Sequence, residues 1–247
     1  MKDNFSTQSD QYAKFRPHYP EALYAFMTNL LREKNQAWDC GTGNGQVASV
    51  LSRYFKAVYA SDISKKQMEQ APVIENIHYL TLTAGEPYFP DQFFDLITVA
   101  QAIHWFDFDK FYKEVHRTLK PGGLMAVIGY GLTRVSPKVD KAIDHFYQNI
   151  VGPYWDPERK YLDEGYQTIP FPFEEINCPE FKIAEEWTLD HFIGYLKTWS
   201  AVKHFEAKNG FNPVDDFTQE LQSAWGTENI KRKVSFPLLT RIGKNKT

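Results

Sequence analysis

The sequence lacks any apolar run long enough to span a bilayer, and its first residues lack the hydrophobic core of a signal peptide. It also lacks a strong charge of either sign, because 28 lysines and arginines stand against 31 aspartates and glutamates. The basic clusters are short, so charge does not indicate a polyanion-binding surface. We therefore expect a cytoplasmic protein that has neither nucleic acid nor membrane as a partner.

Cysteine is scarce as well. The chain has only Cys40 and Cys178, and Cys40 falls inside a predicted strand, so a disulfide framework is not expected. No two of the 7 histidines lie within five positions of each other, so local metal-ligand spacing is absent and no metal site is predicted. The sequence also has no Tyr-x-x-x-Lys pair of the short-chain oxidoreductase type.

What the chain does have is a glycine-rich stretch, Asp-Cys-Gly-Thr-Gly-Asn-Gly at 39–45, between an apolar pair and a helix-like run over 47–55. Such a turn needs glycine where the backbone adopts conformations that a Cβ forbids and where a ligand approaches the backbone closely. A dinucleotide site has the spacing G-x-G-x-x-G, but counting from Gly41 the third position is Gln46, and the glycine comes one residue early. The spacing therefore indicates a nucleotide turn that is not of the NAD type.

Strand and helix patterns alternate around this turn. The strands are predicted at 36–40, 57–61, 77–82, 94–100 and 124–129, and the helices at 21–31, 45–55, 64–71 and 108–119. This alternation predicts an α/β fold with a doubly wound, mostly parallel sheet. With 247 residues and 43% hydrophobic content, the chain suits one domain over 1–247.

The pattern changes after residue 130. Prolines and aromatic residues interrupt 131–180, which we interpret as an insertion over the carboxyl edge of the sheet. Helices are predicted near 189–206 and 213–225, and two last strands at 181–187 and 232–242, which gives seven strands in all. The expected organisation is an N-terminal segment with a helix at 5–35, a core at 36–130, and a cap from 131–180 and 189–228.

Side chains with chemical potential follow the predicted strands. Asp62 ends the second strand, where a carboxylate can accept both ribose hydroxyls of an adenosine; the alternative is a helix N-cap, which Ser61, Asp62 or Ser64 could supply. After the third strand, the small residues of Thr83–Glu86 suit packing beside an adenine, although a plain surface turn is the alternative. After the fourth strand, Gln101, His104 and Trp105 come where the sheet's carboxyl edge opens.

His104 has two readings. Near a reacting centre it could act as a general base and take a proton from a hydroxyl or amine. It could equally be a packed histidine that orients Trp105. Tyr195 and Trp199 are four residues apart, which predicts that they share one helix face and form an apolar wall.

Two stretches carry a family resemblance. Residues 39–45 resemble motif I of the class I S-adenosyl-L-methionine (SAM)-dependent methyltransferases, acidic-x-G-x-G-x-G. Ala-Gln-Ala-Ile-His-Trp-Phe at 100–106 and Leu-Lys-Pro-Gly-Gly at 119–123 resemble the methyltransferase type-11 group that includes trans-aconitate methyltransferase-like proteins. The resemblance covers residues 8–130 well and the last third weakly. It implies a Rossmann-like methyltransferase fold with SAM as the cofactor.

The resemblance also implies roles for individual residues. The cofactor-binding residues it implies are Asp39, Gly41, Thr42, Gly43, Gly45, Gln46, Asp62, Ile63, Ala84, Gly85, Gln101, Tyr12 and Arg16. The substrate-binding residues are His104, Trp105, Tyr19, Tyr195 and Trp199. Asp39 is expected near the methionine end of SAM, and the Y-x-x-x-R-P-x-Y segment at 12–19 is expected to fold over the cofactor as a lid.

The expected function is methyl transfer from SAM to a small molecule. A carboxylate acceptor would need no base, only a cation, for which Arg16, Arg134 and Lys138 are candidates by position; an amine or hydroxyl acceptor would involve His104. The alternatives are a SAM-binding protein without turnover and an NAD(P)-dependent oxidoreductase, which the glycine spacing opposes. Methylation of nucleic acid or protein is disfavoured by the acidic balance. The sequence leaves the acceptor and the oligomeric state open.

Overall fold

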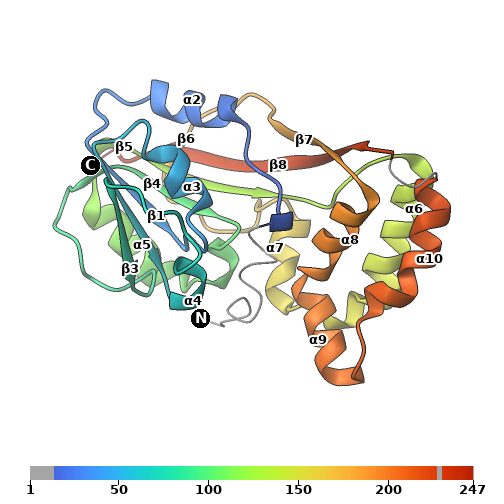
Figure 1. Ribbon diagram of the computed structural model, residues 1–247. Helices are drawn as coiled ribbons and strands as arrows, with labels where there is room; N and C mark the ends of the chain where they lie inside the picture. Colours follow the sequence, from blue (N-terminus) through green and yellow to red (C-terminus); the bar gives the residue numbers. More distant parts are fainter. Residues whose placement is uncertain (1–13, 227–229, 247) are drawn as a thin grey trace.

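The computed structural model describes residues 14–226 and 230–246, which form a β-sheet flanked by helices and a second, helical body beside it (Figure 1). The strands are β1 (Gln36–Cys40), β2 (Ala57–Asp62), β3 (Ile77–Thr81), β4 (Phe94–Ala100), β5 (Leu119–Tyr130), β6 (Glu174–Glu175), β7 (Lys182–Trp187) and β8 (Arg232–Lys244). They lie in the order β3-β2-β1-β4-β5-β8-β6, and β7 also pairs with β8. Strands β1 to β5 are parallel and β8 is antiparallel, so the expected doubly wound, mostly parallel sheet is confirmed.

The outer edge of the sheet is one strand in two pieces. Glu174 of β6 lies opposite Lys244, and Lys182 of β7 lies opposite Pro237, so both pieces follow the same side of β8 with a register that changes by one residue. The chain between them breaks the ladder. The sheet therefore keeps the expected seven-stranded plan, although the structure divides its last edge into β6 and β7.

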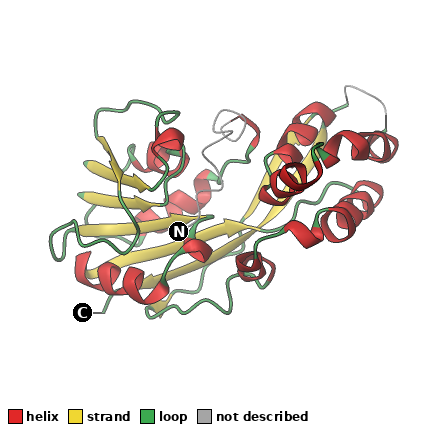
Figure 2. Cartoon of the chain, turned by 90° about the horizontal axis from the view of Figure 1, so that it is seen from below, coloured by secondary structure: helices red, strands yellow, loops and turns green. Residues whose placement is uncertain are grey.

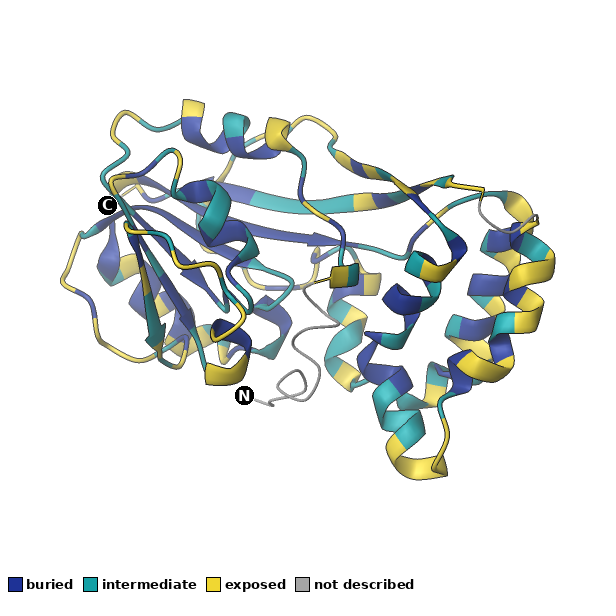
Figure 3. Cartoon of the chain, viewed as in Figure 1, coloured by how far each residue is buried: buried dark blue, intermediate teal, exposed yellow. Residues whose placement is uncertain are grey.

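Helices cover both faces of this sheet. They are α2 (Glu21–Asn29), α3 (Gln46–Leu51), α4 (Lys65–Met68), the short 3-10 helix η2 (Ile103–Trp105) and α5 (Phe108–Thr118). In β1, Ala37 packs in the cluster that contains the buried residues of α2 and α3, whereas Trp38 packs in the cluster that contains Phe111 of α5. Both faces of the central strands are thus buried, which explains why β4 is buried along almost its whole length and does not alternate between buried and exposed residues (Figure 3).

The second body consists of residues 137–163 and 189–225, which lie within the two segments predicted to form the cap, and from here on the cap means these residues. Its helices are α6 (Pro137–His145), η3 (Phe146–Ile150), η4 (Gly152–Tyr154), η5 (Pro157–Arg159), α7 (Lys160–Asp163), α8 (Leu189–Lys197), α9 (Ser200–Asn209) and α10 (Pro213–Trp225). They gather around one end of the long strand β8, away from β1 to β3 (Figures 1 and 2). Both segments expected to make a cap therefore come together.

Two details of the cap differ from the sequence analysis. The insertion at 131–180, where no helix is predicted, contains several short helices. Its prolines do not prevent them, because Pro137, Pro153 and Pro157 sit in first turns, where proline's missing N–H costs nothing. The single helix predicted at 189–206 is wrong: it is two helices, since the backbone of Trp199 is extended between α8 and α9. Tyr195 and Trp199 therefore do not share a helix face.

In the ranges 14–226 and 230–246, the structure contains no helix with both the length and the apolar character that a membrane crossing requires.

Candidate active site

The glycine turn leads from β1 into α3 at the carboxyl edge of the sheet. Gly41, Gly43 and Gly45 all have positive φ angles, of 74°, 56° and 74°, and Gly45 is the residue before the first turn of α3. A Cβ added at Gly41 would lie 2.6 Å from the Cβ of Ala102. Both the backbone conformation and the close approach of the next loop therefore require glycine here.

Asp39, near the end of β1, fixes this turn through hydrogen bonds. Its buried carboxylate accepts hydrogen bonds from the hydroxyls of Thr42 (2.6 Å) and Thr98 (2.9 Å) and from the backbone N–H of Ala48 (3.1 Å). Burial raises the pKa of Asp39 to about 6, against the lowering effect of these three donors. Asp39 thus joins the turn, α3 and β4, and it also lines the cavity above.

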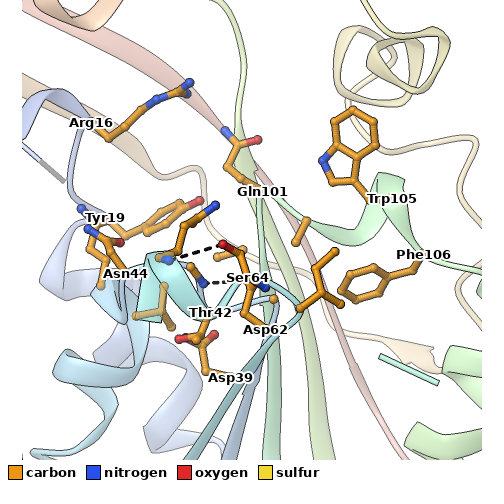
Figure 4. Close-up of a pocket in the computed structure, with 18 of the residues that line it drawn as sticks. Arg16, Tyr19, Asp39, Thr42, Asn44, Asp62, Ser64, Gln101, Trp105 and Phe106 are labelled. Atoms are coloured by element: carbon orange, nitrogen blue, oxygen red, sulfur yellow. Dashed lines mark hydrogen bonds between the residues drawn. The ribbon is translucent and has the colours of Figure 1, made fainter. Parts of the chain in front are cut away.

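Asp62 ends β2 at the same edge. One carboxylate oxygen accepts from the backbone N–H of Gly43 at 2.9 Å, and the other accepts from that of Ser64 at 2.8 Å (dashed lines in Figure 4). The N-cap of α4 is Ser64, whose hydroxyl accepts from the N–H of Gln67. The capping role that the sequence left open thus falls to Ser64, while Asp62 holds the glycine turn against β2.

A cavity opens above these residues (Figure 4). Nine of the predicted cofactor residues line it: Arg16, Asp39, Gly41, Thr42, Gly43, Gln46, Asp62, Ile63 and Gln101. Tyr19 and Trp105, predicted for the substrate, line it too. The residues that sequence reasoning missed are Asn44, Val47, Ser64, Gln67, Ala100, Ala102, Phe106 and Tyr130.

Three of the predicted cofactor residues do not line this cavity among the described residues. A Cβ added at Gly45 would meet Tyr79, and one added at Gly85 would meet Lys110 of α5, so neither position is directed toward the cavity. Ala84 is buried in the cluster beneath the sheet, with Phe89 and Phe111. Tyr12 lies outside the described residues.

A second cavity adjoins the first and reaches into the cap. The two share Arg16, Gln101, Trp105 and Tyr130. Figure 4 shows Arg16, Gln101 and Trp105 above Asp39 and Asp62. The other residues that line the second cavity are His104, Gly131, Trp155, Asp156, Arg159, Leu162, Tyr195, Trp199 and Ser200. Of the predicted substrate residues, His104, Trp105, Tyr195 and Trp199 therefore meet here, although Tyr195 is in α8 and Trp199 lies between α8 and α9.

Arg16 connects the core to the cap at the junction of both cavities. Its guanidinium donates to the Oη atom of Tyr130 on β5 at 3.0 Å and to the backbone carbonyl of Thr198 at 3.1 Å, and it lies over the ring of Tyr195. The neighbouring Phe15 packs against Gly194, where any Cβ would collide with its ring. The described part of the predicted lid, residues 14–19, therefore passes between the sheet and α8.

Arg159 is the second cation of this cavity, and it was not predicted. Its guanidinium stacks on Trp155, 4.5 Å from the ring centroid, and its Nε donates to the Oη of Tyr147 at 3.0 Å. Asp163 accepts from the same Nε at 3.3 Å. Within the described residues, the two terminal amino groups of Arg159 make no hydrogen bond, so they retain donors for a ligand.

His104 is 6% exposed and lines the second cavity. Burial, and then the charge of Arg159, lower the pKa of His104 to about 3. The imidazole is therefore neutral at physiological pH, which favours a hydrogen-bonding role over proton storage.

The missed residues had a weak signal in the sequence. Trp155, Asp156 and Arg159 stand between prolines in a loop without periodicity, where aromatic and charged side chains often serve ligands. Two of the three cations proposed by position are placed elsewhere: Arg134 pairs with Asp144 at 2.8 Å on the surface, and Lys138 lines an outer groove of α6.

Comparison with known proteins gives a consistent result. A family model described as a methyltransferase domain matches residues 38–127. A predicted methyltransferase of Dictyostelium discoideum is 32% identical and aligns over 98% of this chain and 95% of its own length. The structure of a predicted type II methyltransferase from Anaeromyxobacter dehalogenans is 38% identical, covers 94% of this chain and 98% of its own, and superposes with a TM-score of 0.86. A methyltransferase-like structure from Bacillus halodurans, 18% identical over 92% of this chain and 100% of its own, has a TM-score of 0.53 and shows the fold alone.

Proposed function

This chain belongs to the class I SAM-dependent methyltransferases of the type-11 family, and on that premise we propose that it methylates a small carboxylic acid bound in the second cavity. The observation that carries the proposal is Arg159, whose stacked guanidinium borders a largely aromatic pocket next to the cofactor cavity. None of the relatives reported above is named a trans-aconitate methyltransferase. The resemblance to that group therefore stays a prediction and belongs to this proposal.

The first cavity is the proposed cofactor site. SAM supplies a methyl group already activated on a sulfonium, so the protein has mainly to align the acceptor and exclude water. Asp62 ends β2 at the cavity, where its carboxylate would suit two ribose hydroxyls. Gly41 and Gly43 would let the cofactor lie close to the backbone, since their positive φ angles exclude most side chains.

Asp39 has a different role in this proposal from the one the resemblance implied. Three protein donors already surround its carboxylate. We therefore assign it to shaping the turn and to placing a negative charge beneath the cavity, where it would favour the positive charge of SAM.

The second cavity is the proposed acceptor site. Arg16 and Arg159 supply two positive charges there against one carboxylate, that of Asp156. Trp155, Trp199 and Tyr195 supply apolar area. An arginine next to aromatic walls suits an organic anion, because a guanidinium binds a carboxylate through paired hydrogen bonds.

A carboxylate acceptor also agrees with the state of His104. An acid is ionised at neutral pH and attacks without losing a proton, whereas an amine or hydroxyl would need a base. With its lowered pKa, His104 is a poor proton acceptor. This favours the acid over the amine or phenol as the acceptor class.

The test separates the two cavities. Purified protein is incubated with SAM and pools of carboxylic acids, amines and phenols, and release of S-adenosylhomocysteine is measured. We expect turnover with an acid. Arg159→Met should raise the KM for that acid about ten- to a hundredfold, the scale of lost charge-assisted hydrogen bonds, and leave SAM affinity unchanged.

Asp62→Ala should have the opposite signature, weakening SAM binding in calorimetry by about 1.5–3 kcal/mol with little change in the KM for the acid at saturating SAM. Arg134→Met is the matched control, because Arg134 pairs with Asp144 away from both cavities. Turnover of amines or phenols alone, or an Arg159→Met enzyme with an unchanged acid KM, would contradict the proposed acceptor class.

A further inference from the structure

Tyr166 lies behind His104, outside the residues that line either cavity. It is fully buried, and its Oη atom lies 3.3 Å from Nδ1 of His104. The two rings stack with centroids 6.2 Å apart. The hydroxyl of Tyr166 is therefore a hydrogen-bonding partner of Nδ1, which leaves Nε2 as the ring nitrogen that can serve a ligand in the cavity lined by His104.

The backbone of Tyr166 is in an unusual conformation. Its φ of 61° is in the left-handed region, which a residue with a Cβ adopts only when the surrounding structure enforces it. The adjacent Gly165 has a φ of 64°, so two consecutive residues make this turn. In this strained conformation the tyrosine ring is buried inside the protein.

Several contacts hold the turn in place. Arg241 of β8 donates to the backbone carbonyls of Tyr166 (3.3 Å) and Ile169 (2.6 Å), and it forms a paired ion bridge with Glu175 of β6. On the other side, the ring of Tyr166 fills the space above Gly129 of β5, where a Cβ would lie 2.7 Å from the ring. A continuous chain of contacts thus runs from the sheet edge to the back of His104.

We propose that Tyr166 is a positioning residue whose hydroxyl donates to Nδ1 of neutral His104, so that the imidazole carries its hydrogen on Nε2 and donates it to the carboxylate of the acceptor. This inference rests on the proposed function. An imidazole with its hydrogen on Nδ1 would turn a lone pair toward the anion beside Arg159, whereas the other tautomer turns an N–H toward it.

The reaction then needs no proton transfer. One carboxylate oxygen forms the new bond to the methyl carbon, the bond between that carbon and sulfur breaks with its electron pair remaining on sulfur, and the products are a methyl ester and S-adenosylhomocysteine. His104 binds the oxygen that does not attack, together with Arg159, and thereby orients the other. A general base at this position is not needed, because the attacking carboxylate has no proton to lose.

The primary test is the tautomer of His104 in the protein complexed with S-adenosylhomocysteine, read from the nitrogen-15 NMR shifts of its ring, with His104→Gln identifying the signal. We expect the hydrogen on Nε2 in the wild type, and a loss of this preference in Tyr166→Phe. Tyr112→Phe is the matched control, since Tyr112 is also buried and its hydroxyl has no hydrogen-bond partner among the described residues. Hydrogen on Nδ1 in the wild type, or an unchanged tautomer in Tyr166→Phe, would overturn the inference, whether or not an acid substrate is found.

Kinetics with the acid identified in the pools gives a second measure. Tyr166→Phe should lower kcat/KM about tenfold, the effect of one misdirected hydrogen bond, with unchanged SAM affinity. If Tyr166→Phe does not fold, the His104 variants decide: His104→Gln, which can donate from the position of Nε2 but cannot act as a base, should recover a large part of the rate that His104→Leu loses. Equal losses in both His104 variants would mean that His104 takes a proton, and the assignment would fail.

Discussion

The carboxylate of Asp39 is buried close to a second carboxylate, that of Asp62, at the floor of the cofactor cavity. Its three donors stabilise the charged form, yet the loss of hydration dominates and raises its pKa to about 6. The aspartate is therefore more basic in the folded protein than in the unfolded chain. Its effect on stability must depend on pH.

The sign follows from proton binding. Between about pH 4 and pH 6 the folded state keeps a proton on Asp39 that the unfolded state has lost, so the free energy of unfolding falls as pH rises through this window. Asp39→Asn cannot titrate. We expect the stability of Asp39→Asn relative to wild type to rise by about 2–3 kcal/mol from pH 4 to pH 7, measured by urea unfolding.

Taking the difference between the two proteins cancels the other titrating groups, including His104, whose lowered pKa has the opposite effect on the slope. A relative stability that stays constant with pH would mean that Asp39 has an ordinary pKa. A relative stability that falls with pH would mean that its hydrogen bonds outweigh its burial.

At the scale of elements, the break between α8 and α9 shapes the acceptor pocket. The N–H groups of Thr198 and Trp199 bond to carbonyls three residues back, which tightens the end of α8, and the extended backbone of Trp199 then redirects the chain. The ring of Trp199 thereby meets the rings of Tyr195 at 5.8 Å and Trp155 at 5.5 Å.

Trp199 is both wall and core, because it is 3% exposed and also contacts Phe146 of the cap. Truncation to alanine would remove several kcal/mol of packing and confuse the two roles. We therefore expect Trp199→Phe to raise the KM for the acid severalfold while the SAM affinity stays at the wild-type value. Calorimetry with S-adenosylhomocysteine and steady-state kinetics check this together, and a parallel loss of cofactor affinity would place Trp199 in support of the first cavity.

For the whole molecule, the cap and the core are packed as one unit. Leu23 of α2, Val58 of β2 and Trp199 of the cap belong to one continuous cluster of buried side chains, and β8 runs through both parts. We therefore expect a single cooperative thermal transition, consistent with the predicted single domain over 1–247, which stays a prediction until it is measured. The cytoplasmic location predicted from composition also stays a prediction.

S-adenosylhomocysteine at a hundred times its Kd should add about 2.7 kcal/mol to the stability of this unit and raise its Tm by roughly 5–10 °C. Differential scanning calorimetry with and without the ligand tests both statements. Two transitions, of which only one moves with the ligand, would show that the cap unfolds independently of the cofactor-binding core.

The sequence by itself determined the sheet and one side of the site. Strand and helix periodicities are local, and so is the need for glycine at Gly41 and Gly43; these patterns located β1, β2 and β4 and the turn that follows β1. Because parallel strands place their carboxyl ends at one edge, the sequence alone predicts that Asp62 and Gln101 border the same cavity.

Only the tertiary structure decided the acceptor cavity and the direction in which buried groups turn. Arg16, Arg159 and Trp199 meet through the packing of the cap on β8, a contact between segments far apart in the chain that no local pattern encodes. Asp39 turns toward Thr42, Thr98 and Ala48 because those donors surround it in the fold. Burial and charge at a site are sums over neighbours from many segments, so they become determined only when the chain has folded.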